Sequence, residues 1–282
     1  MVRAMQTPHV LTDRPALDRN RARALRNPVL FLHELAAIEV QERLNEVNRR
    51  FTAPAVVTPF AEFWQSVVPQ ARIVGDTDVL DLSVGAHDLV IHAMALHWAN
   101  DPVGQLVQCR RALRPDGLFL GLMFGGQTLA ELRSVLAEAE TQVTGGLSPR
   151  VLPMGEIRDL GGLLQRAGLA LPVADSLTRQ ASYRDFFHLM ADLRAMGEGN
   201  ALHQRLRHPT RRGVFTRAAQ LYKDNFANPD GRVPATFEII CLTGWAPDDS
   251  QQKPLRPGSA THRLAQHLRT DETPLPDKAG GS

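Results

Sequence analysis

The chain has 282 residues, of which 43% are hydrophobic and 22% are charged, and this composition indicates a globular protein with a sizeable core. Its formal net charge of +2 is too small to indicate a nucleic-acid-binding protein. No secretory signal, transit peptide or apolar run that could cross a bilayer is visible, so we expect a bacterial-type cytoplasmic protein. Cys109 and Cys241 lie in separate apolar stretches, and we expect both to be buried rather than disulfide-bonded or nucleophilic.

Two helices are predicted before the first strand. Thr12 or Asp13 caps the first helix, which holds Pro15 in its first turn and is rich in arginine. Such a basic helix is either a solvated surface or a docking surface for an acidic partner or for lipid headgroups. Asn27 and Pro28 begin the second helix, whose apolar stripe predicts that it packs on a core.

Residues 87–126 are predicted to form a strand, a helix and a second strand. The apolar runs 88–91 and 118–124 are typical of buried parallel strands. Between them, Asn100 or Asp101 caps a helix that a Pro-Asp-Gly sequence ends. These elements predict a right-handed βαβ unit.

Motifs in and after this unit resemble a known fold family. The sequences AHDLV (86–90), ALHW (95–98) and LRPDG (113–117) resemble class I S-adenosyl-L-methionine-dependent methyltransferases. Later motifs are similar to a narrower branch, the methyltransferase-like assembly factors of respiratory complex I, implicated in hydroxylating an arginine of a core subunit. These motifs are FGGQTL (124–129), GGLSP (145–149), DLGGLL (159–164), MGEGN (196–200), GW (244–245) and QQKPLRPGSA (251–260). The resemblance covers roughly residues 13–260. It implies S-adenosyl-L-methionine as cofactor and a complex I subunit as protein partner.

The half of this fold that would hold the cofactor departs from the family pattern. The resemblance implies a first strand from about Phe51 that ends in a glycine-rich turn, because glycine lets backbone amides approach the ligand. Residues 52–60 contain no glycine. The next two predicted strands, 71–75 and 78–82, are too close together for a crossover, which needs about a dozen residues. We therefore expect one helix to be missing or reduced to a turn and the adenosine pocket to be reshaped, narrowed or lost.

Asp76 and Asp78 follow the second predicted strand, and they are our candidate acidic residues for cofactor binding. A carboxylate at a strand end can accept hydrogen bonds from ribose hydroxyls. The alternative is that both are turn residues.

His97 and Trp98 follow the strand at 88–91, at the carboxyl edge where open α/β sheets bind ligands. We predict that His97 is the candidate catalytic residue and that both residues contact the cofactor. Trp98 can equally be part of the core. No metal site is predicted, because no cysteine or carboxylate lies at ligand spacing from the histidines.

Gly125 and Gly126 end the strand at 118–124, where they either let a substrate peptide approach the backbone or allow close packing. Residues 183–228 fall outside the strand and helix alternation and are predicted to form a helical cap. The glycine-rich loop within it makes Glu198 and Asn200 candidate substrate-binding residues.

The second half of the chain is predicted to continue the alternation. The expected elements are a helix at 128–143 capped by Thr128, a helix at 156–167, a strand at 169–174, a helix at 183–196 with Phe187 buried, a helix at 210–226 and a strand at 233–245. A second basic cluster comprises His203, Arg205, Arg207, His208, Arg211 and Arg212. This cluster suits an acidic protein surface at least as well as nucleic acid.

The predicted fold is therefore α/β, a class I methyltransferase (Rossmann-like) sheet with flanking helices, shortened in its N-terminal half and carrying a helical cap. We expect N-terminal helices at 1–50, the methyltransferase-like domain at 51–245 and a polar, flexible tail at 246–282.

Two functions follow. The first is an enzyme that methylates or hydroxylates an arginine of a complex I subunit; the second is an inactive methyltransferase fold that binds and assembles that subunit. Neither involves nucleic acid or a transmembrane segment, and peripheral association with the inner face of the membrane fits both.

Overall fold

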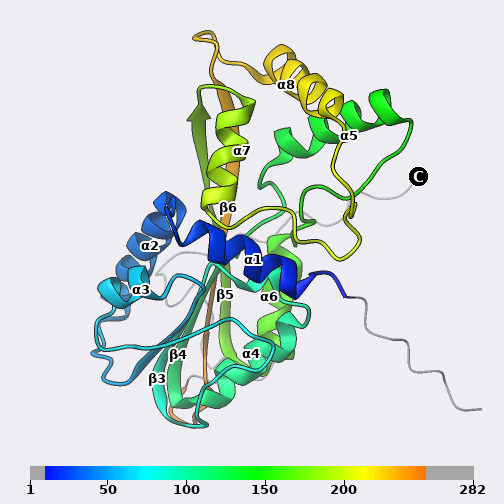
Figure 1. Ribbon diagram of the computed structural model, residues 1–282. Helices are drawn as coiled ribbons and strands as arrows, with labels where there is room; N and C mark the ends of the chain where they lie inside the picture. The colour runs from blue at the N-terminus through cyan, green and yellow to red at the C-terminus, as the bar shows by residue number, and fades with distance from the viewer. Residues whose placement is uncertain (1–9, 252–282) are drawn as a thin grey trace, which may run out of the picture. The chain divides into compact units, whose positions relative to one another are not determined.

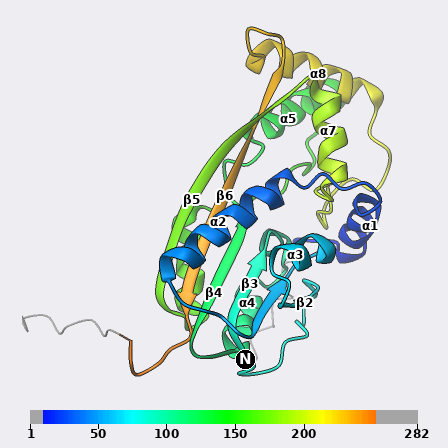
Figure 2. The same cartoon turned by 90° about the vertical axis from the view of Figure 1, so that its left-hand side faces the viewer.

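The computed structural model describes residues 10–251, so our predictions for residues 1–9 and for most of the C-terminal tail lie outside the described residues. The described residues form a six-stranded sheet in the order β2-β1-β3-β4-β6-β5 (Figure 2). The strands are β1 (Pro54–Val57), β2 (Arg72–Val74), β3 (His87–Ala93), β4 (Leu113–Phe124), β5 (Ala170–Tyr183) and β6 (Val233–Trp245). The first four are parallel, and β6 runs antiparallel between β4 and β5. The predicted α/β sheet and its antiparallel final strand are confirmed.

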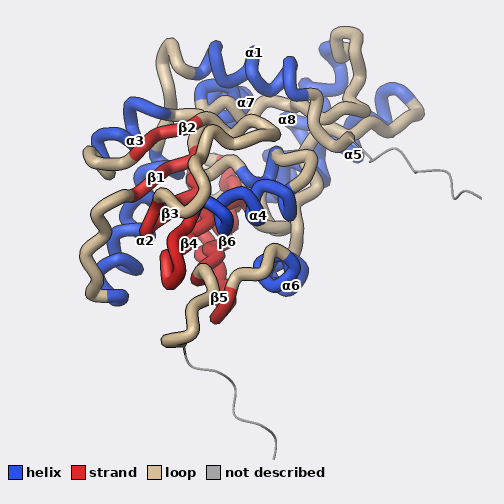
Figure 3. The backbone as a smooth tube through the Cα atoms, turned by 90° about the horizontal axis from the view of Figure 1, so that it is seen from below, coloured by secondary structure: helices blue, strands red, loops and turns tan. Residues whose placement is uncertain are grey.

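Helices cover both faces of this sheet (Figure 3). They are α1 (Arg14–Ala24), α2 (Phe31–Val47), α3 (Ala61–Val67), the 3-10 helix η1 (Leu96–Trp98), α4 (Pro102–Ala112), α5 (Ala130–Thr144), α6 (Ile157–Arg166), α7 (Phe186–Ala195) and α8 (Arg212–Phe226). One face packs against α4 and α6, and the other packs against α2 and α3. None of the helices within residues 10–251 is long and apolar enough to span a membrane.

Side chains of the central strands alternate between these two faces. Val56 and Ile91 belong to the core under α2 and α3, whereas Val57 and Val90 belong to the core under α4 and α6. Because both faces are buried, the strands appear in the sequence as continuous apolar runs. Cys109 and Cys241 are buried and free, as predicted.

Helix ends in the described chain follow the expected capping chemistry. The Asp13 carboxylate accepts a hydrogen bond from the Ala16 amide at 3.1 Å, and Asp101 accepts one from the Gly104 amide at 2.7 Å. Gly145 ends α5 with φ of +72°. These ends were predicted correctly. By contrast, α2 begins at Phe31 and not at the predicted proline.

The N-terminal half is shortened, as predicted, but one predicted strand is wrong. Residues 75–86 form a loop, and no described helix lies between β2 and β3. The run at 78–82 fails to form a strand because it is mostly solvent-facing: Val79 is 79% exposed while Leu80 is buried. A seven-residue helix, α3, makes the crossover from β1 to β2.

Three predictions for the second half are also wrong. Thr128 does not cap α5, because its hydroxyl donates to the backbone oxygen of Glu238 and Leu129 precedes the helix. The helix predicted at 183–196 begins only at Phe186, since Tyr183 still belongs to β5, and Phe187 is 56% exposed rather than buried.

β5 and β6 extend beyond the carboxyl end of β4 as a two-stranded ribbon. Residues 233–238 of β6 pair only with residues 178–183 of β5. In Figure 1, α5, α7 and α8 gather around this ribbon. The segment predicted as a helical cap, 183–228, thus contributes α7 and α8 to a group of helices above one end of the sheet.

Candidate functional site

His97 and Trp98 lie in η1, immediately after β3. Met94 turns the chain at the strand end with φ of +53°, and this places both side chains in the interior. The His97 ring lies 4.7 Å from the Phe124 ring, between centroids, at the end of the neighbouring strand β4. The carboxyl edge of the sheet therefore carries the histidine and tryptophan that the sequence predicted there.

Glu198 reaches these two residues from the loop after α7. Its Oε2 atom accepts a hydrogen bond from the Trp98 indole at 2.7 Å and lies 3.3 Å from Nε2 of His97. Gly197, with φ of +80°, makes the turn that directs the loop inward. Burial alone would raise the pKa of Glu198, but the charges of His97 and Arg21 and the hydrogen bonds from His97 and Trp98 outweigh burial and lower this pKa. Glu198 is therefore an anion held in a largely apolar environment.

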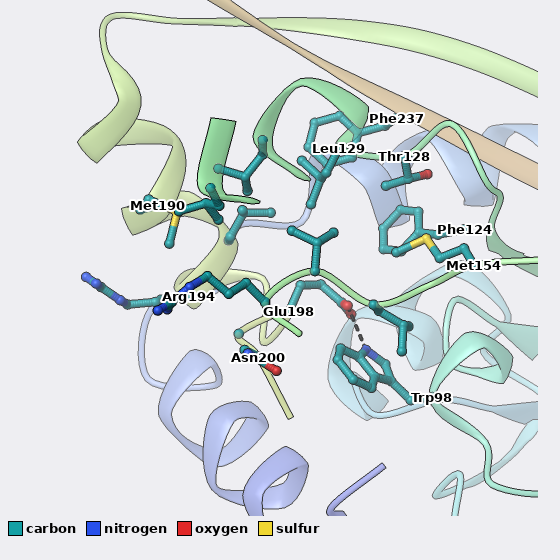
Figure 4. A pocket seen from close by; sticks show the side chains of 17 residues that line it. Trp98, Phe124, Thr128, Leu129, Met154, Met190, Arg194, Glu198, Asn200 and Phe237 are labelled. Carbon is teal, nitrogen blue, oxygen red and sulfur yellow. Dashed lines mark hydrogen bonds between the residues drawn. The ribbon is translucent and has the colours of Figure 1, made fainter. Parts of the chain in front are cut away.

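The Glu198 carboxylate lines a cavity of about 760 Å³, which we call the Glu198 pocket. Figure 4 shows Glu198 beside Trp98 with the hydrogen bond between them. The apolar side chains that line the Glu198 pocket include Phe124, Leu129, Leu132, Met154 and Phe237. The other carboxylate oxygen, Oε1, accepts no hydrogen bond from any residue between 10 and 251. The lining also contains Arg150, which pairs with Glu140, and the exposed Arg194. A largely apolar cavity whose lining includes a carboxylate with a free oxygen suits a long side chain with a cationic tip.

Three other candidate substrate-binding residues have different surroundings. Asn200 lines the Glu198 pocket, but its amide nitrogen donates to the Pro149 backbone oxygen and its amide oxygen accepts from the Leu202 amide. Gly125 and Gly126 do not line the pocket; they pack against the side chains of other elements.

Gly125 is closely packed against the side chains of Glu238 and Ile240, which gives a testable prediction. A Cβ atom there would lie 2.6 Å from a Glu238 carboxylate oxygen and 2.7 Å from Cδ1 of Ile240. We expect Gly125→Ala to lower the free energy of unfolding by about 1–3 kcal/mol, measured by denaturant titration. Gly146→Ala is the matched control, because its Cβ would meet nothing nearer than 3.8 Å. Equal stability of the two variants would contradict the packing account.

Asp76 and Asp78, the candidate ribose contacts, are not equivalent. Asp78 is exposed, whereas Asp76 is buried at the end of β2. Both carboxylate oxygens of Asp76 accept hydrogen bonds from Nη1 of Arg21, at 2.7 and 2.6 Å, and Arg14 adds bonds at 3.1 and 3.2 Å. Burial would raise the pKa of Asp76, but the charges and hydrogen bonds of Arg21 and Arg14 lower it to about 2. The carboxylate that could accept ribose hydroxyls is thus engaged by α1.

Residues 58–60, which follow β1, offer no free amide to a cofactor. The Thr58 amide donates to the Val74 backbone oxygen at 2.9 Å, Pro59 has no amide hydrogen, and the Phe60 amide donates to the Thr58 hydroxyl at 3.2 Å. Phe60 is itself buried in the core under α2 and α3. The turn has no glycine and the Asp76 carboxylate is already paired, so this edge lacks the glycine-rich turn and the available acidic side chain with which such folds usually hold a nucleotide.

α1 contacts both Asp76, after β2, and the loop after α7 that carries Glu198. Its Asn20 side chain donates to the Gly199 backbone oxygen at 3.0 Å, and the Asp13 amide before the helix donates to the Ala201 backbone oxygen at 2.8 Å. An added Cβ at Gly197 would lie 3.2 Å from Cγ of Arg21. The same helix that neutralises Asp76 therefore also holds the loop that carries Glu198.

The comparisons with known proteins agree with this topology. A family model described as a methyltransferase domain matches residues 30–121, which run from α2 into β4. This part of the chain is therefore similar to methyltransferase domains. The sheet, with four parallel strands followed by an antiparallel β6, is the arrangement that the resemblance to the class I fold implied.

Several known proteins are similar to this chain over about two thirds or more of its length. The chain is 40% identical over 208 residues to "Arginine-hydroxylase NDUFAF5, mitochondrial" of Rattus norvegicus, covering 73% of this chain and 60% of that protein. It is 34% identical over 179 residues to the malonyl-[acyl-carrier protein] O-methyltransferase of Xylella fastidiosa (strain M23), covering 64% of this chain and 58% of that protein. A solved structure of phosphoethanolamine N-methyltransferase 2 of Haemonchus contortus with S-adenosyl-L-methionine matches with a TM-score of 0.36 and 10% identity, over 70% of this chain and 49% of that one.

The similarity to the arginine-hydroxylase confirms the resemblance, predicted from the sequence motifs, to the branch that includes arginine-hydroxylating assembly factors. The chain spans about 60% of the length of these first relatives.

The sequence alone did not predict the partners of Asp76. Arg14 and Arg21 are seven residues apart, which places them on one side of a helix after two turns, and this spacing was the available signal. No local pattern links them to Asp76, which lies 55 residues after Arg21.

Proposed function

We propose that this protein binds an arginine-bearing segment of a respiratory complex I subunit, and that the arginine side chain enters the Glu198 pocket. The observation that carries the proposal is the Glu198 carboxylate, which lines a largely apolar cavity and has one oxygen without a donor among the described residues. The names of the relatives, arginine-hydroxylases, support arginine as the side chain concerned.

An arginine fits the pocket in three physical respects. Its methylene groups would pack against the apolar walls, such as Leu129 and Met154. Its guanidinium group would form a charge-assisted hydrogen bond with the free Oε1 of Glu198. The Trp98 and Phe124 rings in the lining could contact its planar face.

His97 and Trp98 hold the carboxylate in place for this contact. Both approach Oε2, on the side of Glu198 where the proposed guanidinium does not bind. We assign both a positioning role in place of the catalytic and cofactor-binding roles expected from the sequence.

Either methylation or hydroxylation requires the same bound arginine, and so does an assembly factor that binds without modifying. The direct test is to purify complex I from a bacterium with and without this gene and to analyse its subunits by peptide mass spectrometry. An arginine that carries an extra oxygen atom or methyl group only when the gene is present supports the enzyme. Loss of assembled complex without any difference in modification supports the assembly factor. An unchanged complex contradicts both.

S-adenosyl-L-methionine-dependent methyl transfer is the alternative suggested by the methyltransferase family model and the O-methyltransferase relatives. The engaged Asp76 and the turn at Pro59 argue against it. We expect calorimetry to detect no saturable binding of S-adenosyl-L-methionine at concentrations up to about 1 mM. Saturable binding within that range would show that Asp76 and the turn at Pro59 do not prevent cofactor binding, and methyl transfer would then be the leading function.

We further propose that the protein works in a bacterial-type cytoplasm, at the inner face of the membrane. The exposed side chains of Arg19, Arg23 and Arg26 support contact with an acidic partner or an anionic surface there.

A further inference from the structure

Two further depressions are neighbours of the Glu198 pocket, because they share lining residues with it or with each other. The first of these shares Arg150 and Val151 with the pocket. The second shares Leu147 and Arg150 with the first. Arg150 lines all three, so the second depression lies near the Glu198 pocket.

We call this second depression the Arg211 groove. It has a volume of about 660 Å³, and its lining includes Leu147, Leu206, His208, Thr210, Arg211 and Val214. Leu147 and Leu206 are 70% and 38% exposed, so part of the lining is apolar and in contact with water. Exposed apolar side chains of this size beside a groove suit the docking of another chain.

The charge of the Arg211 groove is positive. Arg211 and its neighbour Arg212 are exposed, and neither pairs with an acidic residue in the described part of the chain. They stand at the N-terminal end of α8, which has no acidic residue in its first turn and no side-chain cap. The free backbone amides of a helix N-terminus add partial positive charge.

The one acidic residue of the groove lining does not cancel this charge. Glu140 accepts hydrogen bonds from the Arg150 guanidinium at 2.9 and 2.7 Å and from the Ser148 hydroxyl and amide. Its charge is thus neutralised by Arg150.

The structure also divides the basic cluster that the sequence indicated. Arg205 and Arg207 both donate to the Asp13 carboxylate, which holds the pKa of Asp13 well below its usual range. These two arginines tie the segment after the Glu198 loop to the start of α1. Arg211 and Arg212 have no acidic partner within residues 10–251, so they are the arginines of the cluster that remain available for intermolecular contact.

We infer that the Arg211 groove binds an acidic stretch of the same partner segment whose arginine enters the Glu198 pocket. This inference rests on the proposed function and adds the chemistry of the partner: an arginine, an extended spacer, and then aspartate or glutamate beside an apolar side chain. The spacer follows the depression that contains Arg150 and Val151. Opposite charges in two neighbouring sites, the carboxylate of Glu198 and the guanidinium of Arg211, would fix the direction in which the segment lies.

The test uses the full chain and fluorescein-labelled synthetic peptides. Each peptide contains an arginine, a glycine-serine spacer of varied length and a Glu-Leu-Glu stretch, and its matched control replaces the stretch by Gln-Leu-Gln. At low salt we expect the acidic peptide with the best spacer to bind about fivefold more tightly than the control, and salt to reduce this difference.

Two protein variants locate the effect. In the double variant Arg211→Gln/Arg212→Gln the two peptides should bind equally. Arg166→Gln, an exposed arginine on α6 at the opposite face of the sheet, should preserve the difference. Equal binding of both peptides to the unmodified protein at every spacer length, or a difference that persists in the double variant, would overturn the inference.

A further peptide separates this inference from the proposed function. Replacing the arginine by citrulline, which has nearly the same shape and no charge, tests the Glu198 pocket alone. If citrulline weakens binding while the acidic stretch has no effect, the pocket stands and the Arg211 groove proposal is wrong. If the acidic stretch matters and citrulline has no effect, the arginine proposal is wrong.

Discussion

Glu198→Gln is expected to reduce the affinity for an arginine-bearing peptide by at least about tenfold. The substitution keeps the size of the side chain but removes the charge that would bind the guanidinium, and hydrogen bonds to charged groups contribute about 1.5–3 kcal/mol. Each 1.4 kcal/mol corresponds to about a tenfold change in Kd. The measurement is calorimetric titration with the tightest member of a panel of arginine-bearing peptides from complex I core subunits.

The control for this variant must keep the fold intact. Glu156→Gln suits this purpose, since Glu156 precedes α6, does not line the Glu198 pocket and makes no ion pair in the described chain. We expect it to bind the peptide as the unmodified protein does. If Glu198→Gln retained full affinity while remaining folded, Glu198 would not be the recognition group.

The second large effect is expected from the buried ion pairs at the end of β2. In Asp76→Asn, the Arg21 guanidinium, which is 6% exposed, loses its charged partner and remains buried. Removing one member of a buried ion pair costs about 3–5 kcal/mol in the free energy of unfolding. We expect about 3 kcal/mol, because Arg14 is partly exposed and can regain water. Denaturant titration at neutral pH measures this loss.

The pair of Arg72 and Asp81 provides a matched control on the surface. The carboxylate accepts a hydrogen bond from the guanidinium at 2.6 Å, but the two side chains are 46% and 88% exposed. Exposed pairs contribute about 0–1 kcal/mol, so Asp81→Asn should be nearly neutral. Equal effects of Asp76→Asn and Asp81→Asn would show that the pairing at Asp76 does not stabilise the fold.

Asp76 also predicts a pH dependence. Its folded-state pKa of about 2 lies below the ordinary value of 3.8, so its contribution to stability is present above pH 3.8 and is lost as pH falls toward 2. The stability difference between the unmodified protein and Asp76→Asn should therefore shrink across this interval. A difference that stays constant down to pH 2 would contradict the depressed pKa.

The central part of the fold could be predicted because local signals and tertiary structure agree there. The strands at β3 and β4 are buried on both faces and therefore appear as apolar runs, and Asp101 and Gly145 supply recognisable helix ends. The strand predicted at 78–82 was wrong because its alternating residues suit a surface loop as well as a strand. The start of α7 was wrong because the β ribbon continues through Tyr183, and pairing across the ribbon decides that boundary.

The site could be predicted only in part, because its residues come from distant segments. The edge position of His97 and Trp98 followed from strand order, and the similarity of the MGEGN motif indicated Glu198. Their contact spans about 100 residues and depends on how the cap folds over the sheet. The engagement of Asp76 by α1 likewise depends on tertiary packing. The missing glycines predicted a lost or reshaped cofactor pocket. The structure shows in addition that the acidic side chain there, Asp76, is already paired with Arg21.

The most direct test of the Glu198 pocket is the affinity of one peptide in two forms that differ only in arginine or citrulline. Calorimetry with the full chain should give at least about tenfold tighter binding of the arginine form, since only that form carries the charge that pairs with Glu198. The difference should disappear in Glu198→Gln. Equal affinities for the two forms, or tighter binding of citrulline, would contradict the assignment of this pocket to an arginine side chain.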